Sequence, residues 1–352
     1  MNKKEVLEIR KQFSLQNCAI TRICGCYVDG DKEKKLEFKE AFLSLPEEEE
    51  YKYFDLFKRT LSGTVGKNLL NMSFPLEEEQ KGGAQEFLMQ LKDSRLTDDM
   101  LVSEFYDKVI ENYDFGEHYL ILLIHAAYDV PGKASDGMEM YDASDTVYDY
   151  ILCSICPVSL SKAGLCYNAE HNSIEDRIRD WIVNDPVNGF LFPAFNDRAS
   201  DVHSLLYYSK KPEELQEVFL TQVLGCSQVL SAGTQKESFQ AMIADTLGED
   251  CAYSVIRNIH ENLNTLIEEN KEEPEPLELG KPEVRRLFSL SGVPEENLEN
   301  FDREFDETVG AKASLLASNI ASTKKFNIKT PDIVINVNPD RTDLADVRIV
   351  DG

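Results

Sequence analysis

The sequence has few of the patterns by which catalytic sites are recognised. It contains five His and a single Trp, Trp181, in 352 residues. It has no Gly-x-Ser-x-Gly nucleophile elbow, no His-Glu-x-x-His zinc helix and no Gly-x-Gly-x-x-Gly dinucleotide loop. The segment Gly63–Lys67 resembles part of a phosphate-binding loop, but its glycines are too close together and Asn68 replaces the required Ser or Thr. These patterns predict no cofactor.

The sequence also lacks a long apolar run. The longest, Tyr119–Tyr128, is shorter than the roughly 20 residues needed to span a bilayer. The first ten residues are charged and contain no apolar core of a signal peptide. We therefore expect a cytoplasmic protein that does not contact the membrane, with its eight Cys present as thiols.

Basic residues are greatly outnumbered. The chain has 37 Lys and Arg against 64 Asp and Glu, a formal net charge of −27. Such a surface repels phosphate backbones at long range and favours basic or cationic partners. Nucleic acid is therefore a disfavoured partner, although a local basic cluster could still bind it.

The apolar pattern predicts an α+β fold. Residues 18–28 form a β-branched run, and Tyr119–Tyr128 and Val147–Val158 are apolar enough to be strands buried on both faces. Pro46 is followed by four Glu and then by an apolar stripe, which is typical of a helix start. Further helices are predicted near 76–93 and 97–113. We expect a mixed, largely antiparallel central sheet flanked by helices.

The composition suggests a division near the C-terminal end. Residues 1–269 are predicted to form an α+β core domain. Residues 270–280 are rich in Glu and Pro and are predicted to be a linker. Residues 281–352 are expected to form a small α+β module, a helical hairpin followed by β-strands, whose last strand is cut short.

The cysteines are the first candidate metal site. Cys24 and Cys26 fall on the same face of a strand, and Cys153 and Cys156 have the spacing of a zinc or redox pair. Four thiolates could bind zinc. However, Cys153 and Cys156 point to opposite faces if their strand is regular. The alternative is that all four are small buried apolar residues.

A second candidate metal site combines carboxylates with an imidazole. Asp197, Asp201 and His203 could hold a divalent cation and polarise a water, although their spacing matches no strong metal signature. A solvated loop before a strand explains the same residues. The acidic loop between Asp129 and Asp145 is another possible cation ligand, but it lacks the regular spacing of an EF-hand.

Several strings resemble an uncharacterised bacterial family, mostly from Firmicutes, that is defined only as a domain of unknown function (DUF4317-like). The strings are Ala19–Tyr27, Leu61–Lys67, Ala127–Pro131, Tyr150–Pro157, Gly189–Phe195, Thr330–Asp332 and Arg348–Gly352. This resemblance spans the chain and implies a shared fold, but no activity. The order of segments around Val218–Cys226 is also similar to that in bacterial nucleoid-associated proteins.

These observations favour a non-enzymatic cytosolic protein that binds another macromolecule, with an unidentified protein as the partner. One alternative is DNA binding of the nucleoid-associated kind. The other is a metal-dependent hydrolase built on Asp197, Asp201 and His203.

Overall fold

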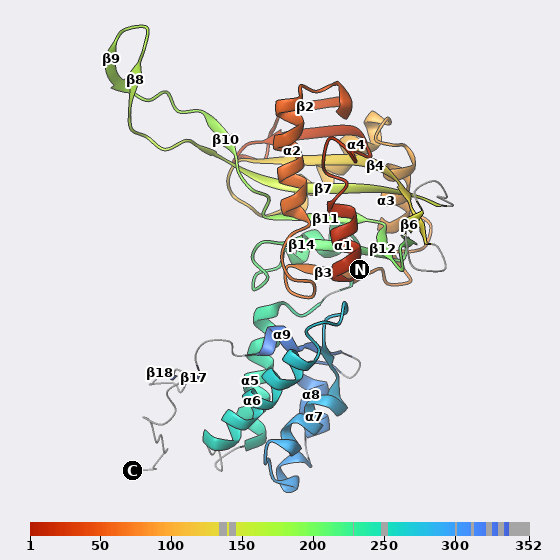
Figure 1. Ribbon diagram of the computed structural model, residues 1–352, viewed down its shortest axis with the longest axis vertical. Coiled ribbons are helices and arrows are strands. Elements are labelled where there is room, and N and C mark those ends of the chain that lie inside the picture. The colour runs from red at the N-terminus through yellow and green to blue at the C-terminus, as the bar shows by residue number, and fades with distance from the viewer. Residues whose placement is uncertain are drawn as a thin grey trace. The chain divides into compact units, whose positions relative to one another are not determined.

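A computed structural model shows two compact units, Met1–Val229 and Leu230–Gly352 (Figure 1). The structure describes all residues except 134–138, 141–145, 228, 248–252, 300, 311–312, 322–325, 330–333 and 338–352. Each unit has a hydrophobic core of its own.

Unit 1 is built on one large antiparallel sheet. Its strands lie in the order β2 (Lys34–Ala41), β1 (Ile20–Val28), β4 (Tyr119–Val130), β7 (Thr146–Leu160), β11 (Asn188–Phe192), β14 (Ser204–Ser209) and β3 (Leu69–Ser73). The short strand β10 (Trp181–Val183) pairs with the end of β7. Every pairing within this sheet is antiparallel, which confirms the predicted α+β class.

Helices cover both faces of the sheet. On one face lie α1 (Lys3–Arg10), the 3₁₀ turn η1 (Phe42–Ser44) and α2 (Glu47–Thr60); on the other lie α3 (Ala84–Asp93), α4 (Asp99–Asn112) and the π-turn η2 (Phe219–Val223) (Figure 1). The two central strands, β4 and β7, are therefore buried on both sides, as their continuous apolar runs predict.

The first two helices begin where the sequence supplies the chemistry for a helix start. Asn2 and Glu5 form a capping box at α1, in which each side chain accepts a hydrogen bond from the other residue's backbone N–H. In α2 the segment Glu47–Glu50 occupies the positive first turn, and Lys58 and Arg59 occupy the negative last turn. The helix predicted after Pro46 is thus confirmed.

Three small hairpins lie outside the main sheet: β5 (Gly132–Lys133) with β6 (Glu139–Met140), β8 (Leu165–Asn168) with β9 (Ser173–Asp176), and β12 (Ala194–Asn196) with β13 (Ala199–Asp201). The β8–β9 hairpin projects from the body of unit 1 at the end of an extended double strand (Figure 1). We call residues 161–180, which include this hairpin, the arm.

Unit 2 is mainly helical. Its core joins α5 (Ala232–Leu247), α6 (Tyr253–Glu269), α7 (Lys281–Leu290), α8 (Phe301–Thr308) and α9 (Ala317–Ile320). It also contains the 3₁₀ turn η4 (Glu295–Leu298) and two strand pairs, β15 (Glu278–Leu279) with β16 (Leu315–Leu316) and β17 (Phe326–Lys329) with β18 (Val334–Val337).

The division between the units lies after Val229, whereas the sequence suggested residue 269. The physical reason is that α5 and α6 bury Phe239, Ile259 and Leu263 against α7 and α8. Residues 270–280 therefore connect helices of a single unit. In the described part of the chain, no helix is long and apolar enough to cross a membrane.

Candidate functional site

The four candidate zinc cysteines do not meet. Cys24, Cys26 and Cys153 belong to the core under α3 and α4, whereas Cys156 belongs to the core under α1 and α2. The alternation of β7 imposes this separation, because residues three apart on a strand face opposite ways. Cys24 and Cys153 are also two strands apart, with Leu123 between them in the register.

The surroundings of these thiols oppose ionisation. Burial raises the pKa of Cys24 to about 11 and that of Cys26 to about 12. Burial also raises the pKa of Cys153 and Cys156. A thiol must lose its proton to act as a nucleophile or a metal ligand, so these four behave as small apolar core residues.

The second candidate cluster forms a turn. Asp197 and Arg198 both have positive φ, 52° and 57°, and they link β12 to β13 as the two central residues of a tight hairpin. The Asp201 carboxylate accepts hydrogen bonds from the His203 backbone N–H and from the Ser204 hydroxyl, at 3.0 and 2.6 Å. The Asn196 amide also donates to this carboxylate, at 2.7 Å, so Asp201 serves to hold the turn together.

The His203 imidazole contacts the carboxylate of Glu79 and not that of Asp201. Its Nδ1 lies 2.9 Å from Glu79, and this contact raises the pKa of His203. Among the described residues, no group of three or more His, Cys, Asp or Glu side chains is arranged to hold a metal ion. Of the acidic loop after Asp129, Asp136, Asp142 and Asp145 lie outside the described residues.

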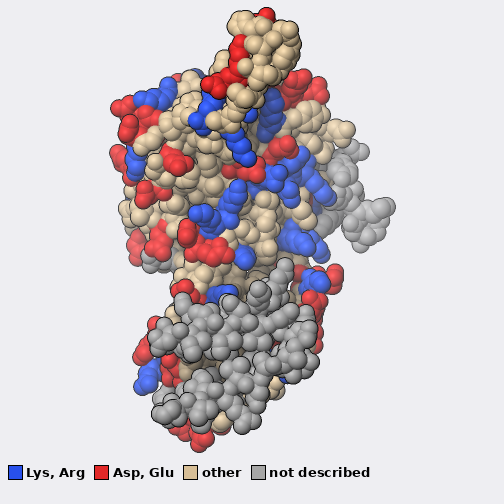
Figure 2. Space-filling model, turned by 90° about the vertical axis from the view of Figure 1, so that its left-hand side faces the viewer, with Lys and Arg blue, Asp and Glu red and all other residues tan. Residues whose placement is uncertain are grey.

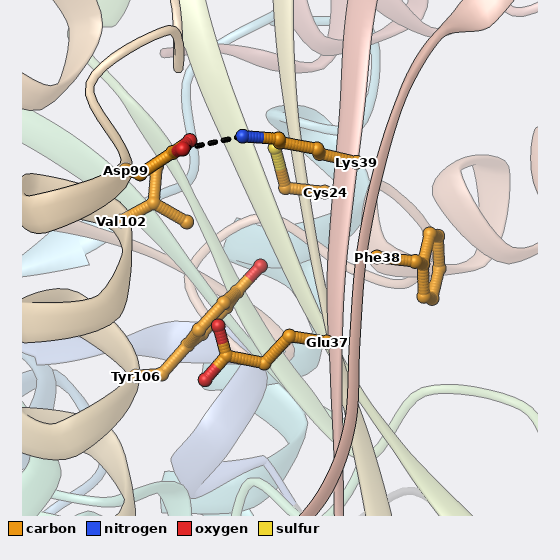
Figure 3. Close-up of a pocket in the computed structure, with 7 residues that line it drawn as sticks. All are labelled: Cys24, Glu37, Phe38, Lys39, Asp99, Val102 and Tyr106. Atoms are coloured by element: carbon orange, nitrogen blue, oxygen red, sulfur yellow. Dashed lines mark hydrogen bonds and ion pairs between the residues drawn. The ribbon is translucent and has the colours of Figure 1, made fainter.

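One pocket lies beside Cys24, between β2 and α4 (Figure 3). Lys39 and Asp99 form an ion pair across its mouth. Figure 3 shows the Tyr106 ring entering from α4 and the Phe38 ring pointing to the other side of β2. Phe38 covers Gly25 there, and a Cβ atom at this position would lie 2.3 Å from the ring, so a larger residue would displace Phe38.

The Tyr106 hydroxyl is buried in this pocket and has no hydrogen-bond partner among the described residues. Burial raises its pKa, so the group stays a neutral phenol. The cavity measures about 220 Å³. This is below the roughly 300–1,000 Å³ of most ligand pockets, so a sizeable substrate would not fit.

A second hollow, which we call the α1–α2 groove, lies between the C-terminal ends of α1 and α2. Leu7 supplies its exposed apolar surface, above the fully buried Phe13, and Arg10, Lys11 and Lys58 supply its charges. It measures about 380 Å³ and is open to solvent. In Figure 2 the blue side chains gather over the centre and right of unit 1, the side on which α1 and α2 lie.

The groove has a surplus of positive charge. Within the described part of the chain, Arg10, Lys11 and Lys58 form no ion pair. Two helix C-termini end here, and each carries about half a negative charge from its backbone dipoles. Together they offset about one of the three positive charges. The remaining surplus lies on a chain whose net charge is −27.

The carboxylates of α1 are already engaged, whereas Asp55, one turn before Lys58 in α2, forms no ion pair among the described residues. Glu8 of α1 accepts two hydrogen bonds from the Arg198 guanidinium, from Nε at 3.1 Å and from Nη2 at 2.8 Å. Glu5 is held in the capping box at the other end of the helix. The neighbouring Arg59 pairs with Asp185 at 3.7 Å. The groove can therefore attract an anionic group from another molecule.

Comparison with known protein families supports the resemblance found in the sequence. A family model described as "Domain of unknown function (DUF4317)" matches residues 1–352. This confirms the expectation of an uncharacterised family. It lends no support to the nucleoid-associated likeness or to a hydrolase. No curated protein matches the chain.

Proposed function

Because the chain belongs to the DUF4317 family, whose description carries no activity, we propose its function from the geometry of the described residues. It is a non-enzymatic cytoplasmic protein that binds an acidic segment of another protein in the α1–α2 groove. The observation that carries this proposal is the set of three cations without ion-pair partners around an apolar surface, on an otherwise acidic chain.

The composition of the groove favours a peptide over nucleic acid. Leu7 is 42% exposed, so a partner's apolar side chain can bury it, while Arg10 and Lys58 lie near enough to meet carboxylates beside that chain. Three cations neutralise few phosphates, and the net charge of −27 repels a polyanion at long range. This partner chemistry differs from the basic partner that the overall charge alone suggests.

The non-enzymatic part of the proposal is supported by the state of the buried reactive groups. The thiols described above are held neutral by burial. Burial also lowers the pKa of His125 and of His260 to about 4, so both are neutral near pH 7. His125 accepts or donates a hydrogen bond at Thr21, 2.7 Å away, and is enclosed in the core.

The test uses the full chain and a fluorescein-labelled amphipathic peptide of Glu and Leu, followed by fluorescence polarisation. We expect saturable binding that the double variant Arg10→Glu/Lys58→Glu weakens at least about 10-fold, since each cation lost is replaced by a repelling charge. The matched control is Lys52→Glu, an exposed position of α2 outside the groove, which changes the dissociation constant less than about twofold.

Two results would overturn the proposal. One is the absence of peptide binding at 100 µM protein (about the weakest affinity that a specific contact of this size should show). The other is displacement of the peptide by a short DNA duplex that binds through the same Arg10 and Lys58, which would assign the groove to nucleic acid instead.

A further inference from the structure

The arm presents an apolar face to solvent. On the β8–β9 hairpin, Leu165, Tyr167 and Ile174 are 72%, 61% and 64% exposed, and Tyr167 lies opposite Ile174 in the register. Just beyond it, Ile178 is 86% exposed. Because strand side chains alternate, the three hairpin residues share one face, and Asp176, opposite Leu165 in the register, lies at its inner edge. The outer part of the arm, at the top of Figure 2, is largely tan.

The opposite face of the hairpin is polar and satisfied. Glu175 accepts hydrogen bonds from the Asn168 amide and the Ser173 hydroxyl, at 3.0 and 2.5 Å, and lies 3.1 Å from His171 Nδ1. These bonds lower the pKa of Glu175. The hairpin thus has one face suited to water and one suited to a protein contact.

The hairpin pairs with no third strand in the described part of the chain. A two-stranded hairpin is only marginally stable in water, and three or more strands with a covered apolar face are normally required. Both of its outer edges are therefore available for pairing, and its apolar face is available for packing. The apolar residues of this face are largely exposed.

The charges of the arm are divided along its length. Its base, residues 161–164 and 176–180, contains Lys162, Arg177 and Arg179 against two carboxylates. Its outer part, residues 165–175, contains Glu170 and Glu175 and neither Lys nor Arg. In the part of the molecule that is described, the three basic side chains form no ion pair; Arg179 Nε instead donates to the Ser161 carbonyl at 2.7 Å.

We propose that two copies of this chain associate through their arms, apolar face against apolar face and antiparallel about a two-fold axis. In that arrangement the apolar face of each hairpin covers the other, and the acidic tip of each arm lies beside the basic base of its partner. A two-fold contact requires a self-complementary surface, and this division of charge provides it. The occupant is therefore a second copy of this chain.

A contact through the arms also reduces the electrostatic repulsion between two copies of this acidic chain. Two copies each carrying −27 repel one another strongly when their bodies touch. Charges more than about 8 Å apart are largely screened at physiological ionic strength. A contact made at the ends of projecting arms keeps the bodies apart while the nearly neutral arms meet (Figure 1).

The root of the arm is held in place. Trp181 and Val183 of β10 pair with Leu160 and Val158 of β7, and the Trp181 indole packs against the His118 ring in a tilted arrangement with a centroid distance of 4.2 Å. A contact surface whose direction is fixed in advance loses less conformational entropy on binding.

The experiment is sedimentation velocity of the full chain from 1 to 100 µM in 0.15 M NaCl. We expect a monomer–dimer equilibrium that Tyr167→Glu weakens by about 100-fold, because the substitution buries a charge twice in a two-fold dimer. The matched control is Leu290→Glu, at a 70% exposed apolar residue of unit 2, which leaves the equilibrium unchanged.

Charge reversal tests the antiparallel arrangement itself. Glu170→Lys and Arg177→Glu should each weaken the dimer, and the two together should restore it, because the reversed charges again meet across the axis. A monomer at 100 µM overturns the proposal, as does a dimer that Tyr167→Glu leaves intact. Since Tyr167 is exposed, an unchanged far-ultraviolet dichroism spectrum shows that the variant folds. Peptide binding in the α1–α2 groove is measured separately, so the two proposals can fail independently.

Discussion

The His118 ring contacts both Trp181 and Tyr27: it packs against the indole in a tilted arrangement at a centroid distance of 4.2 Å, and its Nδ1 is hydrogen-bonded to the Tyr27 hydroxyl at 2.7 Å. Tyr27 belongs to β1 and Trp181 to β10, two strands that are not neighbours in the sheet. His118 therefore connects the root of the arm to the body of unit 1.

Replacing His118 with Ala should loosen the arm and leave the fold intact. An aromatic pair contributes about 0.5–1.5 kcal/mol, so the loss should be local. We expect amide hydrogen exchange in Trp181–Val183 to accelerate about 10-fold. Tyr27→Phe, which keeps the ring and removes the hydrogen bond, is the matched control and should have a smaller effect. Equal exchange rates in the His118→Ala variant and the wild type would show that this contact does not hold the arm.

A buried polar network ties α4 to the sheet. The Tyr113 hydroxyl donates to Asn188 Oδ1 at 2.6 Å, and Asn188 Nδ2 donates to the Tyr207 hydroxyl at 2.7 Å. Asn188→Ala should lower the free energy of unfolding by about 3 kcal/mol, because it leaves a buried hydroxyl unpaired. Tyr113→Phe should cost about 1 kcal/mol. Urea denaturation measures both, and the reverse order of the two losses would contradict this account.

Acid should destabilise the fold through its buried histidines. The folded pKa of His125 and of His260 is about 4, lowered by burial, and that of an unfolded histidine is near 6.5. The unfolded chain therefore binds protons first as the pH falls. The stabilisation is complete above pH 6.5 and is lost between pH 6.5 and 4, at up to about 1.4 kcal/mol per pH unit for each histidine.

Urea denaturation at pH 7, 6 and 5 tests this expectation. His125→Gln should keep a polar group beside Thr21 and should reduce the dependence on pH in that window. A variant whose stability falls with pH as steeply as that of the wild type would show that His125 does not titrate in this way.

The cysteines should differ in reactivity according to burial. Cys24, Cys26, Cys153 and Cys156 are buried, whereas Cys18 and Cys166 are partly exposed. With Ellman's reagent at pH 8, we expect Cys166 to react readily and the four buried thiols to react only on unfolding. Cys166→Ser should reduce the fast phase, and the partly exposed Cys18, whose pKa is raised by burial, should react more slowly. Elemental analysis should find no stoichiometric zinc. One zinc per chain would contradict the conclusion that Cys24, Cys26, Cys153 and Cys156 are apolar core residues.

Much of the fold could be predicted because it follows from local chemistry. The continuous apolar run of β4 and the Pro46 start of α2 are both readable from the sequence. The helix expected near 76–93 begins only at Ala84, because Gly82 has a φ of +90°, outside the helical region, and Gly83 is the extended N-cap residue. The packing of α5 and α6 with α7 depends on distant contacts, which the sequence pattern did not reveal.

The groove could not be predicted for a similar reason. In the sequence, Lys58 and Arg10 each have the pattern of an ordinary basic residue in the last turn of a helix, where it stabilises the negative end of the dipole. Only the tertiary structure brings these two helix ends, 48 positions apart in the sequence, to one hollow. The projecting arm could not be predicted either, since alternation of side chains predicts a strand but not whether anything covers it.

The most direct test of the central claim is a charge exchange across the α1–α2 groove, measured by isothermal titration calorimetry. The wild-type chain should bind the acidic Glu/Leu peptide at least about 10-fold more tightly than a Lys/Leu peptide of equal length, and Arg10→Glu/Lys58→Glu should reverse that preference. Binding of the two peptides with equal affinity to both proteins, or a preference that the double variant does not change, would contradict the assignment of this groove to an acidic protein segment.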